Sequence, residues 1–259
     1  MLEPVQYLLG AASGSLVGFT LGLVGGGGSI LAVPLIVYFV GVTSPHVAIG
    51  TSALAVAANA GANLVPHARQ GTIKWRCAGM YAFAGVLGAY GGSTLGKAFD
   101  GQHLLFLFAM LMLVVGALML RNRGNLGNPD VQCRRENGPK VIAYGSATGL
   151  FSGFFGIGGG FLIVPGLMAS TGMPMINAVG SSLVAVTAFG LTTALNYALS
   201  GLVDWGLAAT FIGGGIIGGV TGAAASRRLS ARKGLLNSVF AVLILGVAIY
   251  MLWRSWSVM

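Results

Sequence analysis

The 259-residue chain has very few charged side chains. Only 7% of its residues are Asp, Glu, Lys or Arg, and the acidic ones number five. Soluble domains carry about 25% charged residues, so this chain has too little polar side chain to cover a water-exposed globule. Its two cysteines, Cys77 and Cys133, are far apart and predict neither a disulfide framework nor a metal site. The opening stretch, MLEPVQYLLG, lacks a basic segment and a cleavage site, so we interpret it as the start of a first membrane span.

The few charges are also placed where catalysis or ion relay would not use them. Glu3, Asp100, Asp130, Glu136 and Asp204 lie at segment ends or in loops. We therefore expect no paired-carboxylate enzyme, no metal site and no carboxylate proton relay. The sequence also lacks the G-x-x-x-x-G-K-[ST] phosphate loop, and we expect no cofactor. The net charge of +9 comes from basic residues at segment ends, which fits membrane topology better than nucleic-acid binding.

What the chain does have is apolar sequence and glycine. Hydrophobic residues make up 55%, the mean hydropathy is +0.85 and glycines number 44. Ten apolar segments can be marked, at residues 5–24, 29–42, 45–66, 76–96, 103–120, 140–156, 160–172, 175–199, 206–226 and 234–253. The second and seventh are shorter than the roughly 20 residues that a straight membrane-spanning helix needs. This pattern predicts an all-α membrane protein of about ten transmembrane segments, embedded in a lipid bilayer.

The same unusual motif occurs twice. Residues 18–34 read GFTLGLVGGGGSILAVP, and residues 149–165 read GLFSGFFGIGGGFLIVP. Gly22, Gly25, Gly27, Gly28, Leu31, Val33 and Pro34 recur at an offset of 131, and Gly50, Ser52, Trp75, Gly85, Gly88 and Gly92 recur at an offset of 130. The repeat predicts two homologous halves, at residues 1–121 and 140–259, joined by a polar cytoplasmic linker at residues 122–139.

The basic residues predict that the two halves are inverted. In the first half Arg69, Lys74 and Arg76 lie between the third and fourth segments, and the next loop has only Lys97. In the second half the matching loop, YALSGLVDWG, has no basic residue. Arg227, Arg228, Arg232 and Lys233 crowd the loop after it. With five crossings per half and both termini outside, 12 of the 14 basic residues face the cytoplasm, as the positive-inside rule requires.

The glycine clusters are the best candidate for a binding site. Each glycine costs roughly 1 kcal/mol in a helix interior, so each cluster should break its helix and start a short new one. A helix N-terminus carries about half a positive charge and free N–H groups. Two such helices entering from opposite sides could hold a small anion near the midplane. The candidate substrate-binding residues are Gly25, Gly26, Gly27, Gly28, Ser29, Thr51, Ser52, Asn59, Asn63, Gly156, Gly158, Gly159, Gly160, Ser181, Ser182, Thr187 and Asn196.

Other interpretations of these residues stay open. Glycines also let helices pack closely, and this is the favoured interpretation of Gly85, Gly88, Gly92, Gly215, Gly218 and Gly222. The hydroxyls of Thr51, Ser52, Ser181 and Ser182 would contact a ligand or bond to their own helix. His46 and His67, near segment ends, are interfacial side chains or a pH-sensitive gate.

The two motifs resemble those of a known family. GLVGGGGSILAVPLIV and GFFGIGGGFLIVPGLM, followed by AIGTS and AVGSS, are similar over nearly the whole chain to the sulfite exporter TauE/SafE family of permeases. The resemblance implies transport of sulfite, sulfoacetate or related sulfonates across a bacterial inner membrane. The family's glycine-proline motif falls on residues 25–34 and 156–165, and its Gly-Thr/Ser-Ser element on residues 50–52 and 180–182. Gly26 matches Ile157 and Ser29 matches Gly160, so the halves need not contribute equally.

We therefore expect a secondary transporter that exports small sulfur-containing anions by alternating access, and no enzyme. A passive anion channel is the alternative, and a membrane assembly partner without a transport role is a weaker rival. The expected partners are a small anionic substrate and the lipid bilayer, with no nucleic acid. A homodimer is compatible with the sequence, which does not specify a coupling ion.

Overall fold

The computed structural model describes residues 3–121, 137–156, 160–229 and 235–256, and every regular element within these ranges is helical. The all-α class is thus confirmed for the described residues. Most of the predicted linker, residues 122–136, lies outside them, as do Gly158 and Gly159.

The first half begins with α1 (Pro4–Val24), which ends at the first glycine cluster. A 3₁₀ stretch, η1 (Gly25–Leu31), follows, then one turn of α-helix, α2 (Ala32–Pro34), and a π-helical turn, η2 (Leu35–Phe39). Three longer helices complete this half: α3 (Pro45–Arg69), α4 (Trp75–Ala98) and α5 (Gly101–Arg121). The short second segment was predicted at residues 29–42, but its helical structure runs from Gly25 to Phe39, because the glycine cluster forms a 3₁₀ stretch of the kind that often precedes an α-helix.

The second half repeats this order with α6 (Gly138–Phe155), α7 (Gly160–Thr171), α8 (Met175–Ala198), α9 (Trp205–Leu229) and α10 (Leu235–Trp256). Each helix lies within a few residues of its predicted segment. Among the described residues four stretches are long and apolar enough to cross a membrane: Pro45–Arg69, Gly101–Leu118, Met175–Ala198 and Trp205–Ala225. Gly28–Phe39, Gly160–Thr171 and Ile244–Arg254 are shorter apolar helices.

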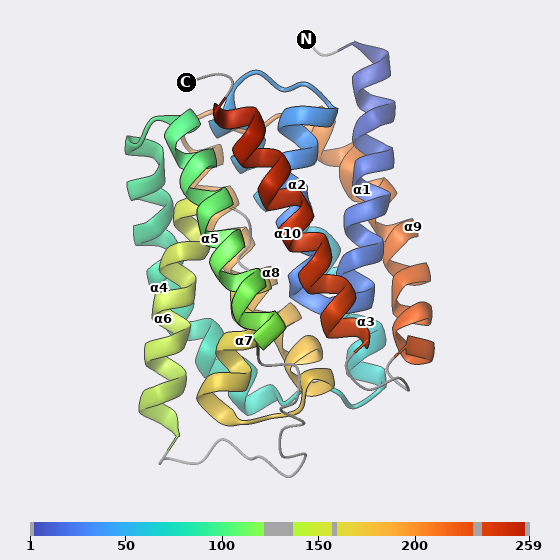
Figure 1. Ribbon diagram of the computed structural model, residues 1–259, viewed down its shortest axis with the longest axis vertical. Helices are drawn as coiled ribbons and strands as arrows, with labels where there is room; N and C mark the ends of the chain where they lie inside the picture. The colour runs from blue at the N-terminus through green and yellow to red at the C-terminus, as the bar shows by residue number, and fades with distance from the viewer. Residues whose placement is uncertain (1–2, 122–136, 157–159, 230–234, 257–259) are drawn as a thin grey trace.

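The helices of one half pack mainly against those of the other. Helix α1 lies along α9, α4 along α6, α3 against α8, and α5 against α10 (Figure 1). In Figure 1, α5 and α10 run side by side at the front, with the α4–α6 pair on one flank and the α1–α9 pair on the other. The buried core therefore forms between the halves and not within either one.

Within each flanking pair, α1 with α9 and α4 with α6, the two helices touch along a row of glycines, which we call a glycine seam. Along α1, Gly14 and Gly18 lie directly against the backbone carbonyls of Phe211 and Gly215 in α9. Along α6, Gly149 lies in the same way against Gly85 of α4. A side chain at these positions would overlap the neighbouring backbone, so only glycine allows this approach. The packing interpretation is confirmed for Gly85, Gly88, Gly92, Gly215, Gly218 and Gly222, each of which lies against atoms of a neighbouring helix.

One expectation about cysteine is wrong. Cys77 is buried near the start of α4 and is disulfide-bonded. Wide separation along the chain was the reason for expecting no disulfide, but folding sets the spatial distance between two cysteines independently of that separation. Cys133 lies outside the described residues.

Candidate functional site

Two helices break at glycines with left-handed backbone. Gly25 ends α1 with φ of 69°, and Gly156 ends α6 with φ of 66°. L-residues with a side chain rarely adopt such angles. Both glycines are buried: Gly25 lies against Val179 of α8, and Gly156 lies against Ile49 of α3. The expected broken helices are therefore present at both motifs.

The two breaks meet inside the bundle. An added Cβ at Gly26 would lie 2.8 Å from the Cα of Gly160, and one at Gly160 would overlap the carbonyl group of Gly26. The first residue of α7, Gly160, therefore touches Gly26 at the start of η1. We call this contact between η1 and α7 the crossing. The structure brings the two glycine motifs, 131 residues apart in register, into direct backbone contact.

Buried serines hold the backbone of these breaks. The Ser182 hydroxyl accepts a hydrogen bond from the Gly26 N–H (3.1 Å) and donates to the Val179 carbonyl (2.8 Å). The Ser29 hydroxyl donates to the Gly26 carbonyl at 2.9 Å. Ser52, the counterpart of Ser182, donates to the Ile49 carbonyl at 2.9 Å, and its Oγ also lies 3.5 Å from the carbonyl oxygen of Gly156. These hydroxyls fix the conformation of the crossing.

Thr51 and Ser181 face loops of the opposite half. The Thr51 hydroxyl accepts from the backbone N–H of Asp204, and the Ser181 hydroxyl accepts from that of Lys74, both at 2.9 Å. Asp204 and Lys74 directly precede α9 and α4. In this structure both hydroxyls hold helix starts, away from the crossing of the glycine motifs.

Two asparagines on α3 lie against glycines of α9. Asn59 is fully buried, and neither its amide nitrogen nor its amide oxygen has a hydrogen-bond partner in the part of the chain that the structure describes. Its amide group packs on Gly215. Asn63, 3% exposed, donates from Nδ2 to the Asn59 carbonyl at 2.9 Å and packs on Gly219. Asn59, near the middle of α3, is therefore a predicted site residue whose side-chain amide could still bond to a ligand.

Among the remaining predicted residues, Thr187, Gly28 and Asn196 have hydrogen-bond or packing partners of their own. Thr187 donates to Leu183 of its own helix at 2.8 Å. Gly28 is buried against the backbone of α1, Gly27 lies within η1, and Gly158 and Gly159 lie outside the described residues. Asn196 is near the end of α8, where its Nδ2 donates to the hydroxyls of Ser93 (2.6 Å) and Thr94 (3.0 Å).

The sequence analysis missed Lys97 as a partner of Asn196. The Lys97 ammonium donates to the side-chain oxygen of Asn196 (2.8 Å), to its backbone carbonyl (3.1 Å) and to the Ser200 hydroxyl (2.8 Å). A signal was present in the sequence, because Lys97 follows the glycine-rich stretch GGSTLG and is separated along the chain from the other basic residues.

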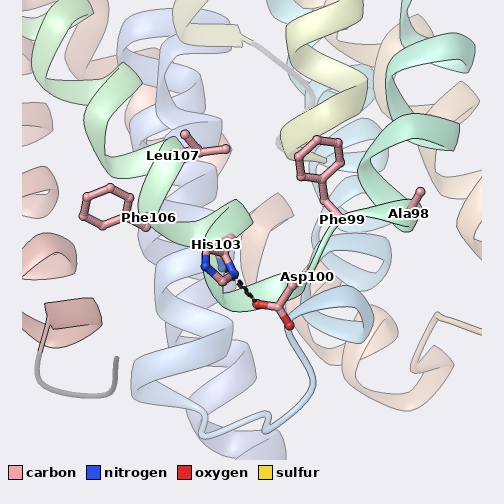
Figure 2. Close-up of a pocket in the computed structure, with 6 residues that line it drawn as sticks. All are labelled: Ala98, Phe99, Asp100, His103, Phe106 and Leu107. Carbon is pink, nitrogen blue, oxygen red and sulfur yellow. Dashed lines mark hydrogen bonds and ion pairs between the residues drawn. The ribbon is translucent and has the colours of Figure 1, made fainter.

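A surface groove of about 560 Å³ lies where α4 turns into α5 (Figure 2). Its lining is mostly apolar, with Phe99, Phe106 and Leu107, but Asp100 and His103 pair across it at 3.0 Å. Hydrogen bonds from the backbone and side chain of His103 hold the pKa of the Asp100 carboxyl below its ordinary value. His103 lies in the first turn of α5. This apolar groove is on the outer surface of the bundle and contains none of the predicted site residues.

A bundle of apolar helices with two buried helix breaks in contact is an architecture typical of membrane transporters. Comparison with known proteins agrees. Residues 10–251 match the sulfite exporter TauE/SafE family, and the chain belongs to that family.

Relatives share most of their length with this chain. It is 57% identical over 246 residues to a probable membrane transporter protein of Xylella fastidiosa (strain 9a5c), which covers 95% of this chain and 94% of the relative. It is 24% identical over 265 residues to the probable membrane transporter protein YunE of Bacillus subtilis, covering 93% and 96%. No solved structure matches the chain. The chain is a multi-pass membrane transporter.

Proposed function

We propose that this protein is a secondary transporter that exports small sulfur-containing anions, with sulfite as the leading substrate, by alternating access around the crossing of η1 and α7. The observation that carries the proposal is the backbone contact of Gly26 with Gly160, which joins one broken helix from each half at a buried point. Broken helices of this kind place backbone dipoles and N–H groups where an anion can be held. The family's description as sulfite exporters supports the substrate class.

The proposal includes an inverted arrangement of the two halves. Equivalent contacts support it: Gly18 packs on Gly215 as Gly149 packs on Gly85, at offsets of 131 and 130. The first turn of α1 and the last turn of α10 lie at one end of the bundle, whereas the end of α5 lies toward the other (Figure 1). An odd number of passes in the first half reverses the second. The positive-inside rule then places the linker in the cytoplasm and both termini outside.

Asn59 is the side chain that we assign to the substrate. A buried amide with no partner costs about 1–3 kcal/mol for each unpaired group, so its presence at a fully buried position calls for a partner that comes and goes. The amide N–H group would donate to an oxyanion. The offset of 130 puts Phe189 at the equivalent position of α8, packed on Gly85 as Asn59 packs on Gly215. The two halves would therefore contribute unequally to the site, with a polar group from α3 and an apolar wall from α8.

Counterflow in proteoliposomes tests the proposed function. Purified protein in liposomes preloaded with unlabelled sulfite should accumulate labelled sulfite from outside, and the initial rate should saturate with external concentration. Protein-free liposomes and chloride-loaded proteoliposomes are the controls. Flux without saturation or counterflow would identify a passive channel, and no flux of sulfite, sulfonate or thiosulfate with or without a pH gradient would refute transport of this substrate class.

A further inference from the structure

Several polar contacts lie at the end of the bundle where the chain begins, and one of them, between Lys97 and Asn196, joins the two halves. Gln6 of α1 donates to the Val40 carbonyl at 3.0 Å, and His46 Nε2 at the start of α3 lies 3.1 Å from the Phe99 carbonyl just after α4. The ends of α4 and α8, which carry Lys97 and Asn196, meet at this same end. The proposed orientation places it outside the cell.

The ammonium of Lys97 has hydrogen bonds but no countercharge. Its three bonds go to the neutral oxygens of Asn196 and Ser200, and no carboxylate of the described residues lies within ion-pair distance of it. The Asp100 carboxylate, three residues further on, pairs with His103, and that of Asp204 accepts from the Leu207 N–H. A partly buried cation with no countercharge attracts anions more strongly than a cation in water does.

Two neighbouring aromatic side chains, the first of them beside Lys97, carry buried hydrogen-bonding groups with no partner among the described residues. The ring of Tyr197 is fully buried with its centroid 5.9 Å from Lys97 Nζ, and the Tyr197 hydroxyl has no partner among the described residues. The ring of His46 lies 6.4 Å from that of Tyr197, centroid to centroid, and its Nδ1 is buried without a hydrogen-bond partner among the described residues. A small anion needs a positive charge and hydrogen-bond donors, and the Lys97 ammonium and the Tyr197 hydroxyl offer one of each.

We propose that Lys97, Ser200 and Tyr197 form a second anion site at the outer mouth of the pathway, separate from the crossing of the glycine motifs. A small oxyanion there would replace neutral oxygens around the Lys97 ammonium and accept from the Tyr197 hydroxyl. Because Lys97 belongs to the first half and Asn196 to the second, the incoming anion also releases a link between them. This inference rests on the proposed transport function and names where the substrate enters or leaves.

Counterflow measured separately with sulfite supplied on the external face and on the cytoplasmic face tests this site. In right-side-out vesicles, Lys97→Gln keeps a donor near Asn196 but removes the charge, and we expect the external sulfite concentration at half-maximal exchange to rise at least about tenfold, the size of one charge-assisted hydrogen bond. In inside-out vesicles, the half-saturating concentration on the cytoplasmic face should stay within twofold. Lys97→Arg keeps the charge and should restore most of the external affinity. Lys140→Met removes a charge from the exposed start of α6 and is the control, which should leave the external half-saturation unchanged.

The outcomes separate the two proposals. An unchanged external half-saturation in Lys97→Gln overturns the outer site while leaving transport intact, and so does an equal loss at both faces. Absence of saturable exchange in the wild type refutes the transport function itself. If Lys97→Gln does not yield folded protein, Tyr197→Phe takes its place, because it removes one hydroxyl with no partner among the described residues and should raise external half-saturation several-fold. An unchanged value there also overturns the site.

Discussion

Replacing Asn59 by leucine should make the protein more stable and less active. Asn59 is fully buried, and neither its amide nitrogen nor its amide oxygen has a partner among the described residues, each at a cost of about 1–3 kcal/mol. Leucine has a similar branched shape, and Phe189 shows that this register accepts a large apolar side chain against a glycine. Fitting the leucine methyl groups into a packed core lowers the free energy of unfolding by about 1–3 kcal/mol. Taking the middle of each range, about 4 kcal/mol relieved and about 2 kcal/mol lost, we expect a net gain of about 2 kcal/mol, which raises the thermal midpoint by about 4–8 °C for a chain of this size.

The assay pairs stability with transport in one preparation. The thermal midpoint is measured in detergent by size-exclusion chromatography after heating, and sulfite counterflow is measured in proteoliposomes, where Asn59→Leu should lose at least about 90% of the initial rate. Thr192→Val is the control, because the Thr192 hydroxyl donates to the Ala188 carbonyl of its own helix and Thr192 is not a candidate site residue. A more stable variant with wild-type flux would show that the amide has no role in transport. A clearly lower midpoint would refute the reasoning that the amide is unpaired.

Two further variants test the packing and the crossing. Gly149→Leu should abolish monodisperse protein in size-exclusion chromatography, because a side chain there overlaps the backbone of α4, whereas Gly91→Leu, with open space around it, should behave as wild type; equal behaviour of the two would contradict the seam. Ser182→Ala removes the acceptor of the Gly26 N–H. The buried N–H group left without an acceptor should lower the free energy of unfolding by about 1–3 kcal/mol, measured as a lower thermal midpoint. No change in midpoint would mean that another acceptor replaces the hydroxyl.

The sequence predicted the helices well because their causes are local. Long apolar stretches and glycine breaks set the bounds of α3, α7 and α8 to within a few residues, and positive φ at Gly25 and Gly156 follows from the glycine clusters themselves. The positions of the seam glycines also follow from their spacing, since residues four apart share one face of a helix.

The site was harder to predict because its contacts join the two halves. Thr51 and Ser181 were expected at the ligand, but each accepts a backbone N–H from a loop 153 or 107 residues away. Nothing in the local sequence specifies such a partner. Repeat symmetry holds a usable signal, since Thr51 and Ser181 are equivalent at an offset of 130, and so are Lys74 and Asp204. Asn196 was recognised as a polar residue within a span, but its pairing with Lys97 depends on the packing of α4 against α8.

The glycine seams also determine when the protein can fold. Gly18 meets Gly215, so the glycine face of α1 lacks the helix that it packs on until a further 197 residues have been made. At roughly 5–20 residues per second this wait lasts about 10–40 s. During that time the grooved face of α1 is exposed to lipid or to the insertion machinery. Assembly of this bundle is therefore a late event in its synthesis, and the interval before it is when quality-control proteases would find an unfinished chain.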